Sequence, residues 1–509
     1  MQTIATAAAL MLAQPAPAPR PADVAPEAAV PGTALTVYSS ADPAGFDPQR
    51  FVQEQRATGS DNAWGVPGYG VVKVVRKVQV PKGMGELAFT DVAAWIDPTT
   101  VSFADLEDPA TAVVEQSFQF DLLSPSKLLD RYLGQQLTVS APLGSSASTI
   151  TGTLMSMSQG ALVVKTQSGI RMVPLAGAQV EFGALPGGLI SRPTLVWKLS
   201  SPSGGEHAVR TTYQTAGMTW RADYNLVLDA ADASGSMTAW VTLMNLSGAS
   251  YPDAELKLVA GNVQKVQPRP MYRAKPMAMA DSIEGGTAGF REKEFFEYHL
   301  YSLPRRTDVL QNSTQQIALF PPVSGFKATK ELVLDLAGGV GPQGAPIVDR
   351  DFVIARKGNP SVLVGFENRK DNSLGMPLPA GKVRVFKEDP ADGTLEFVGE
   401  DLIGHTPRNE TVRVRLGEAF DVVGERRRTD FSVDEAAKRM RETIEVEVRN
   451  QKPRAERVRV LERPYRWGNW EISRNSDPFA KLDSGTIAFD VEIPAEGTKV
   501  IRYTADYSW

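Results

Sequence analysis

The sequence contains no cysteine and only three histidines in its 509 residues. Without thiols the chain cannot form disulfides, zinc–thiolate sites or iron–sulfur clusters, and it has no cysteine nucleophile. His207, His299 and His405 are far apart in the chain, so no local metal-binding pair such as H-E-x-x-H exists. We therefore predict no transition-metal site. A Ca²⁺ site with oxygen ligands is still an alternative, because aspartate and glutamate are plentiful.

Long apolar runs are also missing after the N-terminus, so we expect no transmembrane helix, which needs about 20 such residues. The short apolar run Thr3–Ala13 has the length of the hydrophobic region of a secretory signal peptide. An Ala/Pro-rich stretch, Gln14–Pro31, follows it, although no Lys or Arg precedes the run. We predict that 1–32 is a signal peptide with its linker, and that the protein is periplasmic or secreted.

The chain has no excess of basic residues, because the formal net charge is −5, and no long block of like charges occurs. Nucleic acid is therefore not an expected partner. One glycine pattern, G-x-G-x-x-G at Gly339–Gly344, is of the dinucleotide-binding type, but Pro342 interrupts it and a strand-like pattern follows. A dinucleotide site needs a helix at that point. We interpret the glycines as a loop and predict no cofactor.

Several segments of the sequence show alternation of apolar with polar or charged residues. Val412, Val414 and Leu416 alternate with Arg413 and Arg415. The same period of two marks the segments 72–80, 237–243, 255–258 and 444–449. A period of two indicates strands with one buried and one wet face, which is typical of antiparallel sandwiches and barrels. The predicted fold is all-β, with several stacked antiparallel β-sandwich or small-barrel domains.

One short helix is expected near 125–133. Ser124 is a suitable N-cap, Pro125 takes the first helical position and Gly134 terminates the helix. Its apolar stripe would be Leu128, Leu129, Tyr132 and Leu133. The stretch 434–442 is a second candidate helix, although strand patterns flank it.

Turn residues and changes in strand length divide the chain into five predicted parts. The signal peptide and linker cover 1–32, and an N-terminal β domain ending in the short helix covers 33–133. A small SH3-like barrel is expected over 134–186, because its strands are very short and its turns tight. A large central β-sandwich covers 187–435, and an immunoglobulin-like C-terminal domain covers 436–509.

A series of phrases, in order along the chain, resembles a bacterial family. The phrases are Ala94–Val101, Phe120–Pro125, Gly217–Tyr224, Asn245–Gly248, Leu258–Asn262, Pro379–Val385 and Gly417–Asp421. The family is the one called domain of unknown function 4139, and the similarity covers nearly all of the chain after residue 65. The resemblance implies a secreted or periplasmic β-rich protein. It implies no established reaction, cofactor or catalytic set.

The densest group of candidate ligand-binding residues is Trp220, Arg221, Asp223 and Tyr224. Strand alternation would place Trp220 and Tyr224 on one face, and Arg221 and Asp223 on the other. Such a group serves either as an aromatic ligand platform with a charged pair or as a core tryptophan beside a structural ion pair. We favour the structural interpretation.

A second candidate lies in the C-terminal aromatics Tyr465, Trp467 and Trp470, because sugar-binding modules stack pyranose rings on exposed aromatic side chains. In a regular strand, Tyr465 and Trp467 would share one face and Trp470 would point to the other. A small domain also needs large apolar side chains in its core. We therefore expect at least one of the two tryptophans to be core.

The absence of local catalytic signatures shapes the functional hypothesis. No G-x-S-x-G nucleophile elbow occurs, and the catalytic residues of any reaction stay unknown. The favoured hypothesis is a non-enzymatic envelope protein, a structural or binding scaffold for a protein or polysaccharide partner. One alternative is a periplasmic hydrolase with dispersed Asp, Glu or Ser catalytic residues. Another is a lectin-like glycan-binding protein.

Overall fold

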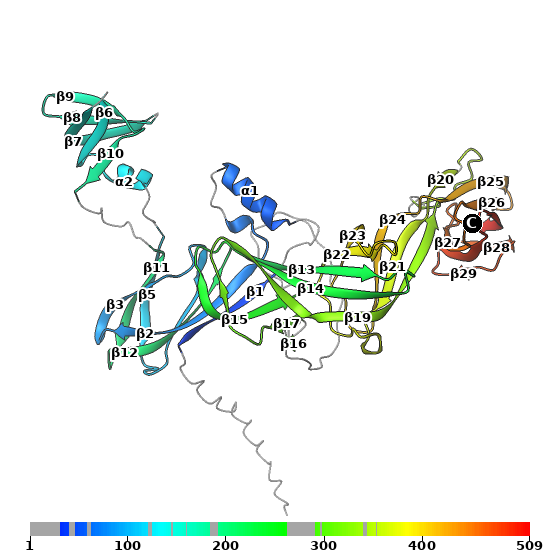
Figure 1. The fold of residues 1–509 in the computed structure, drawn as a ribbon, viewed down its shortest axis with the longest axis horizontal. Helices are drawn as coiled ribbons and strands as arrows, with labels where there is room; N and C mark the ends of the chain where they lie inside the picture. The colour runs from blue at the N-terminus through cyan, green and yellow to red at the C-terminus, as the bar shows by residue number, and fades with distance from the viewer. Residues whose placement is uncertain are drawn as a thin grey trace, which may run out of the picture.

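The protein is almost entirely β-sheet (Figure 1). The computed structural model describes residues 31–39, 46–58, 63–120, 125–143, 146–158, 160–183, 192–261, 291–295, 298–338, 344–352 and 354–509. Most of the expected signal peptide and linker, and the glycine pattern before Gly344, lie outside these residues. In the part of the chain that is described, no helix is long and apolar enough to cross a membrane.

The N-terminal half forms an eight-stranded sheet. Its strands, in spatial order, are β16 (Arg291–Phe295), β17 (Tyr298–Ser302), β15 (Tyr251–Ala260), β1 (Gly32–Tyr38), β2 (Tyr69–Val80), β12 (Gly205–Thr215) and β4 (Ile96–Asp105), and β18 (Thr307–Val309) also pairs with β15. Strand β1 runs antiparallel to β2 but parallel to β15. The sheet therefore joins strands from both sides of the expected boundary at 133, and that boundary does not separate sheets.

Two further sheets pack with the eight-stranded sheet to form a first sandwich. A three-stranded sheet has the order β3 (Gly83–Thr90), β11 (Thr194–Ser201) and β5 (Ala112–Gln119). A ten-stranded sheet has the order β23 (Leu395–Ile403), β22 (Gly381–Glu388), β13 (Met218–Leu228), β14 (Ser234–Asn245), β19 (Ser313–Asp335), β27 (Glu456–Glu462), β30 (Ile487–Ile493) and β29 (Ala480–Lys481), with β21 (Ser361–Glu367) joining β19 to β24 (Thr411–Glu418). Apolar faces of all three sheets contribute to one continuous core.

Strand β19 links this core to a second one. Its first half pairs with β14 and buries Leu319 and Phe326 in the first core. Its last residues pair with β27 and bury Leu332 and Leu334 in the C-terminal core. One continuous strand of 23 residues thus carries side chains into both cores.

The C-terminal sandwich is closed by a five-stranded sheet. Its order is β20 (Arg356–Gly358), β25 (Val422–Asp434), β26 (Arg439–Asn450), β31 (Thr498–Ser508) and β28 (Trp470–Asn475). Residues 434–442 form the end of the β25–β26 hairpin rather than a helix, and Lys438 adopts a positive φ of 51° in its turn. The expected boundary at 435 therefore falls inside a hairpin.

A small separate sheet follows the helix α2 (Pro125–Arg131). Its order is β10 (Gln179–Phe182), β6 (Gln136–Leu143), β7 (Ser146–Ser158), β8 (Ala161–Thr166) and β9 (Gly169–Pro174). Leu129 and Tyr132 pack into its own core, whereas Leu133 is exposed. The sheet is open, because β9 and β10 occupy its two edges and do not pair. In Figure 1 it lies at the end of the molecule opposite the C-terminal sandwich.

The remaining helix, α1 (Pro48–Thr58), lies beside the first sandwich. The side chain of Asp47 caps it by accepting hydrogen bonds from the backbone N–H groups of Gln49 and Arg50. A small apolar cluster attaches this region to β14 through Met244. Two short 3₁₀ turns, Ala63–Gly65 and Lys370–Asn372, complete the described helical structure.

Candidate binding groove on the C-terminal sheet

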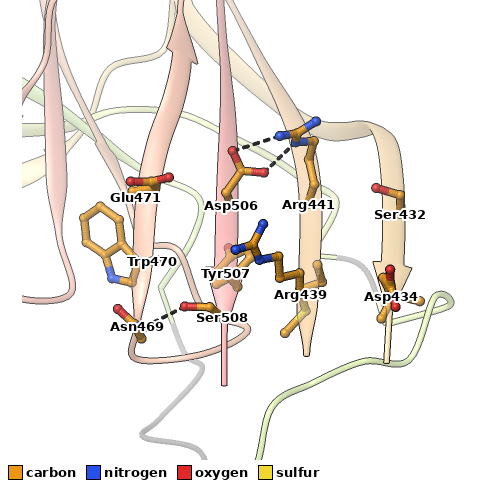
Figure 2. A pocket seen from close by; sticks show the side chains of 12 residues that line it. Ser432, Asp434, Arg439, Arg441, Asn469, Trp470, Glu471, Asp506, Tyr507 and Ser508 are labelled. Atoms are coloured by element: carbon orange, nitrogen blue, oxygen red, sulfur yellow. Dashed lines mark hydrogen bonds and ion pairs between the residues drawn. The ribbon is translucent and has the colours of Figure 1, made fainter. Parts of the chain in front are cut away.

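The outer face of the C-terminal sheet contains a groove of about 560 Å³ at the end of strands β25, β26, β31 and β28 (Figure 2). Its lining residues are Ser432, Val433, Asp434, Arg439, Met440, Arg441, Asn469, Trp470, Glu471, Asp506, Tyr507 and Ser508. Apart from Val433, Met440, Trp470 and Tyr507, these side chains are polar or charged. The groove is therefore a polar surface rather than an apolar cavity.

Strand alternation places the polar side chains there. Along β26, Arg439 and Arg441 are exposed, whereas Met440 and Glu442 between and after them are buried. The pairing register of the sheet then aligns one residue from each of four strands in a row. Arg441 lies between Ser432 and Asp506, and Glu471 lies on the far side of Asp506. A second row places Arg439 between Asp434 and Ser508.

The centre of the first row is an ion pair. Arg441 Nε lies 2.5 Å from Asp506 Oδ1, and Arg441 Nη2 donates to Asp506 Oδ2 at 3.3 Å. Although partial burial of this carboxyl opposes the effect, hydrogen bonds from Arg441 and Ser473 hold the pKa of Asp506 below its ordinary value. Asp506 is therefore ionised near neutral pH.

Each row also contains a charged side chain with no side-chain partner. Among the described residues, the side chains of Arg439 and Glu471 make no hydrogen bond and no ion pair. Asn469 Nδ2 donates to Ser508 Oγ at 2.7 Å and fixes the end of β28 against β31. Beside the neutralised Arg441–Asp506 centre, the groove thus presents the cation of Arg439, with the carboxylate of Asp434 on the neighbouring strand, and the anion of Glu471.

Beneath the groove lies a buried ion pair. Arg466 and Glu442 are both buried, and Arg466 Nε donates to Glu442 Oε2 at 2.8 Å. Tyr507 donates from its hydroxyl to Glu442 Oε1 at 2.7 Å. The guanidinium of Arg466 also donates to the backbone carbonyls of Ile347, Asp349 and Phe352. These bonds attach the connection after β19 to the C-terminal sheet.

A second buried pair repeats the arrangement. Arg426 Nε donates to Glu462 Oε2 at 2.9 Å, and both side chains are inaccessible to solvent. Tyr503 donates to Glu462 Oε2 at 2.7 Å, and Arg426 Nη1 donates to the carbonyl of Ile354 at 2.6 Å. Burial raises the pKa of Glu462 even though Arg426 counteracts it. Both pairs are enclosed and satisfied, so they hold the fold together and do not contact solvent.

The first group of sequence-predicted residues takes up the positions that alternation predicted. Trp220 and Tyr224 are core residues, with Trp220 Nε1 donating to the carbonyl of Val37 at 3.1 Å and the Tyr224 hydroxyl donating to that of Pro379 at 2.8 Å. Neither aromatic ring is available as a ligand platform in this structure.

Arg221 and Asp223 lie on the opposite face of β13. Arg221 Nε donates to Asp223 Oδ2 at 3.2 Å, and the Thr242 hydroxyl donates to the same oxygen at 2.6 Å. Arg384 lies 3.5 Å from the other oxygen, Asp223 Oδ1, at ion-pair distance but without hydrogen-bond geometry. Arg221 also donates to the carbonyl of Phe46 and so holds the segment before α1. These contacts give the pair a structural role.

Tyr465 and Trp467 lie in the connection between β27 and β28 rather than in a regular strand, and Trp470 is the first residue of β28. Tyr465 is buried, and its hydroxyl donates to Glu442 at 3.3 Å. Trp467 and Trp470 are partly buried, and both pack against the C-terminal core. The ammonium of Lys481 lies 4.4 Å from the ring centroid of Trp470. Of the three, Trp470 alone lines the groove.

Of the three histidines, His207 forms a side-chain pair that the sequence did not indicate. His207 Nδ1 lies 2.5 Å from Asp105 Oδ2, and both side chains are almost completely buried. The hydrogen bond to Asp105 raises the pKa of His207. Asp105 also accepts from the Thr111 hydroxyl and from the backbone N–H groups of Glu107 and Asp108, so the pair closes the β4–β5 turn.

Metal ligands do not cluster in the described part of the chain, where no group of three His, Asp or Glu side chains is arranged to hold an ion. In comparisons with known proteins, no family model and no curated protein matches the chain. Apart from Trp470, the groove residues were not predicted from the sequence, because they come from four strands and only the pairing register brings them together.

Proposed function

We propose that this is an exported, non-enzymatic scaffold of the bacterial envelope, and that the C-terminal groove binds a segment of a protein partner. The observation that supports this is the pair of unpartnered side chains, Arg439 and Glu471, which flank the Arg441–Asp506 ion pair on an open face. Fixed charges of both signs complement a polypeptide that carries the opposite pattern, and such complementarity sets specificity and register.

The central carboxylate of the groove, Asp506, is poorly suited to act as the acid in hydrolysis. A glycoside hydrolase needs a carboxylic acid with a raised pKa opposite an ionised carboxylate. Asp506 has a lowered pKa, because Arg441 stabilises its ionised form. Burial raises the pKa of Glu462, but this carboxyl is enclosed in the core and bound to Arg426 and Tyr503. This favours binding over the hydrolase alternative.

The lectin-like alternative loses its main sequence argument, because Tyr465 is buried and Lys481 lies over Trp470. We retain membership of the domain of unknown function 4139 family as a proposal, supported by the ordered phrases and compatible with the all-β architecture. Export rests on the apolar Thr3–Ala13 run. N-terminal sequencing of the mature protein tests it, and an intact Met1 on cytosolic protein would exclude export.

Site-specific photo-crosslinking tests the groove. A photoreactive residue replaces Ser432 in the full-length chain, and the adducts from intact cells are identified. We expect one dominant protein adduct, which is lost when R439E and E471R are added. The control K357E/E410K reverses two exposed, unpartnered side chains outside the groove and should keep the adduct. An adduct that survives R439E/E471R, or that disappears in the control, would contradict the proposal.

A further inference from the structure

A second open cavity, of about 860 Å³, lies on the small sheet at the opposite end of the molecule from the groove. It is formed by β6, by β7 and by the β8–β9 hairpin. Its lining residues are Gln136, Thr149, Ile150, Thr151, Gly152, Thr153, Met155, Lys165, Thr166, Gln167, Ser168 and Arg171. The side chains are mostly hydroxyls and amides, two are cationic and none is acidic.

The charge distribution around this cavity is one-sided. Between Gln136 and Gly183 the charged residues are Lys165, Arg171 and Glu181. Both cations line the cavity, whereas Glu181 belongs to the edge strand β10, lies opposite Thr138 of β6 and does not line the cavity. Among the described residues, neither Lys165 nor Arg171 makes a side-chain hydrogen bond or an ion pair, and both are exposed. Two free cations with no neighbouring carboxylate favour an anionic ligand.

The hydroxyls beside the cations form a ladder between β6 and β7. Thr138 and Thr151 share a hydrogen bond of 3.0 Å, and Ser140 and Thr149 share another of 3.0 Å. A hydroxyl can donate once and accept twice, so each member of such a pair keeps hydrogen-bonding capacity for a ligand. This ladder repeats at every second residue along the strand and complements a ligand with regularly spaced hydroxyls.

One large apolar side chain lines the same cavity. Met155 is 51% exposed. Such side chains pack against the C–H faces of sugar rings, and methionine adapts its shape to irregular partners.

We propose that this cavity of the small sheet binds an acidic polysaccharide, with Lys165 and Arg171 pairing with its carboxylates. The hydroxyl ladder binds the sugar hydroxyls, and Met155 contacts a ring face. The site is independent of the C-terminal groove, so a chain with both could link a polysaccharide to a protein partner. The polysaccharide is defined here by its chemistry, a polymer of hydroxyl-bearing rings with a regular negative charge.

Other polyanions fit less well. Nucleic acid binding relies on neutralising many phosphates, and this cavity supplies two cations in a chain of net charge −5. Recruitment to an anionic membrane takes clusters of about four to eight Lys or Arg residues. Neither of these ligands would make use of the hydroxyl ladder.

The test measures binding of the full chain to polygalacturonate, a carboxylated polysaccharide, with dextran as the neutral polymer. We expect saturable binding to polygalacturonate that weakens as salt increases, and no binding to dextran. In K165Q/R171Q the affinity should fall at least about tenfold, equivalent to about 1.4 kcal/mol. Circular dichroism and the melting temperature should stay unchanged, because both side chains are exposed and unpaired.

The matched control K82Q/K357Q removes the same charge from two exposed, unpartnered positions outside the cavity and should bind like the wild type. An equal loss in this control, or full binding by folded K165Q/R171Q, would overturn the proposal. Vesicles containing phosphatidylglycerol provide the remaining comparison. Binding to these vesicles without binding to polygalacturonate would assign the cavity to a lipid surface instead.

Discussion

Arg466 and Arg441 lie on neighbouring elements, and each pairs with a carboxylate, but their surroundings differ. Arg466 and Glu442 are enclosed, whereas the side chain of Arg441 is 56% exposed beside Asp506. Removing one partner of a buried pair leaves an uncompensated charge in a medium of low polarity. An exposed pair is screened by water.

We therefore predict that Arg466→Ala lowers the free energy of unfolding by about 3–5 kcal/mol, because Glu442 stays buried without its partner. The substitution also removes the bonds that hold the 347–352 connection. Arg441→Ala should cost no more than about 1 kcal/mol. Urea denaturation of both variants measures the difference, and similar small losses in the two would contradict the structural role of the buried pair.

The His207–Asp105 pair predicts a pH dependence of stability. The hydrogen bond to Asp105 raises the pKa of His207, so its contribution is complete below about 6.5 and is lost as pH rises through the folded-state value. Burial raises the pKa of Asp105, but hydrogen bonds from His207 and neighbouring groups outweigh it. The Asp105 contribution is therefore present above about 3.9 and is lost as pH falls through its lowered value.

The pair should thus stabilise the protein most between about pH 4 and pH 6.5. Melting temperatures of the wild type and His207→Gln, measured from pH 4 to pH 9, test this. The difference between the two should be largest in the acidic part of the range and should shrink above neutrality. A difference that grows with increasing pH would show that the folded protein holds His207 in its neutral form.

At the level of strands and turns, each segment in which we found a period of two lies in a strand of the structure. The alternation in 412–416 and 444–449 corresponds to β24 and β26. It did not predict the 434–442 turn, where the helix-forming residues Glu435, Ala436 and Ala437 lie in the bend of a hairpin. It also could not predict that β1 pairs in parallel with β15, because that partner is more than 200 residues away and pairing depends on the whole sheet.

The same limit applies to the candidate sites. Alternation correctly placed Trp220 and Tyr224 on one face of β13 and Arg221 and Asp223 on the other. These positions depend on a single strand. The condition of a regular strand over 465–470 is met only at Trp470, the first residue of β28, because residues 463–469 connect β27 and β28. The groove could not be predicted, because the row that contains Arg441 and Asp506 exists only once β26 and β31 are in register.

The parallel pairing of β22 with β13 depends on a close backbone approach. A Cβ added to Gly381 would lie 2.2 Å from the carbonyl oxygen of Ala222, which is far inside van der Waals contact. We predict that Gly381→Ala destabilises the protein by about 1–3 kcal/mol, because the two strands must move apart. Gly404→Ala is the matched control, since a Cβ there meets nothing within 4 Å. Chemical denaturation should show a loss for the first variant alone.

On the scale of the whole molecule, β19 makes the two large cores parts of one structure. Leu319 lies in the first core and Leu334 in the second, on the same strand. The small sheet differs, because Leu154 belongs to a core of its own. Elements that share a strand should unfold together, whereas a core with no shared strand can open separately.

This organisation predicts two thermal transitions. Leu319→Ala and Leu334→Ala should lower the same transition, and Leu154→Ala should lower a different one, each by removing a fully buried side chain worth about 2–5 kcal/mol. The sequence provides a selective probe, because no tryptophan occurs between residues 96 and 196 and the small sheet therefore contributes none. Tryptophan fluorescence should report only the transition of the large cores, whereas calorimetry should detect both.

If Leu154→Ala lowered the fluorescence transition as much as Leu319→Ala, the small sheet would belong to the same cooperative unit. If Leu334→Ala split that transition in two, β19 would not couple the cores.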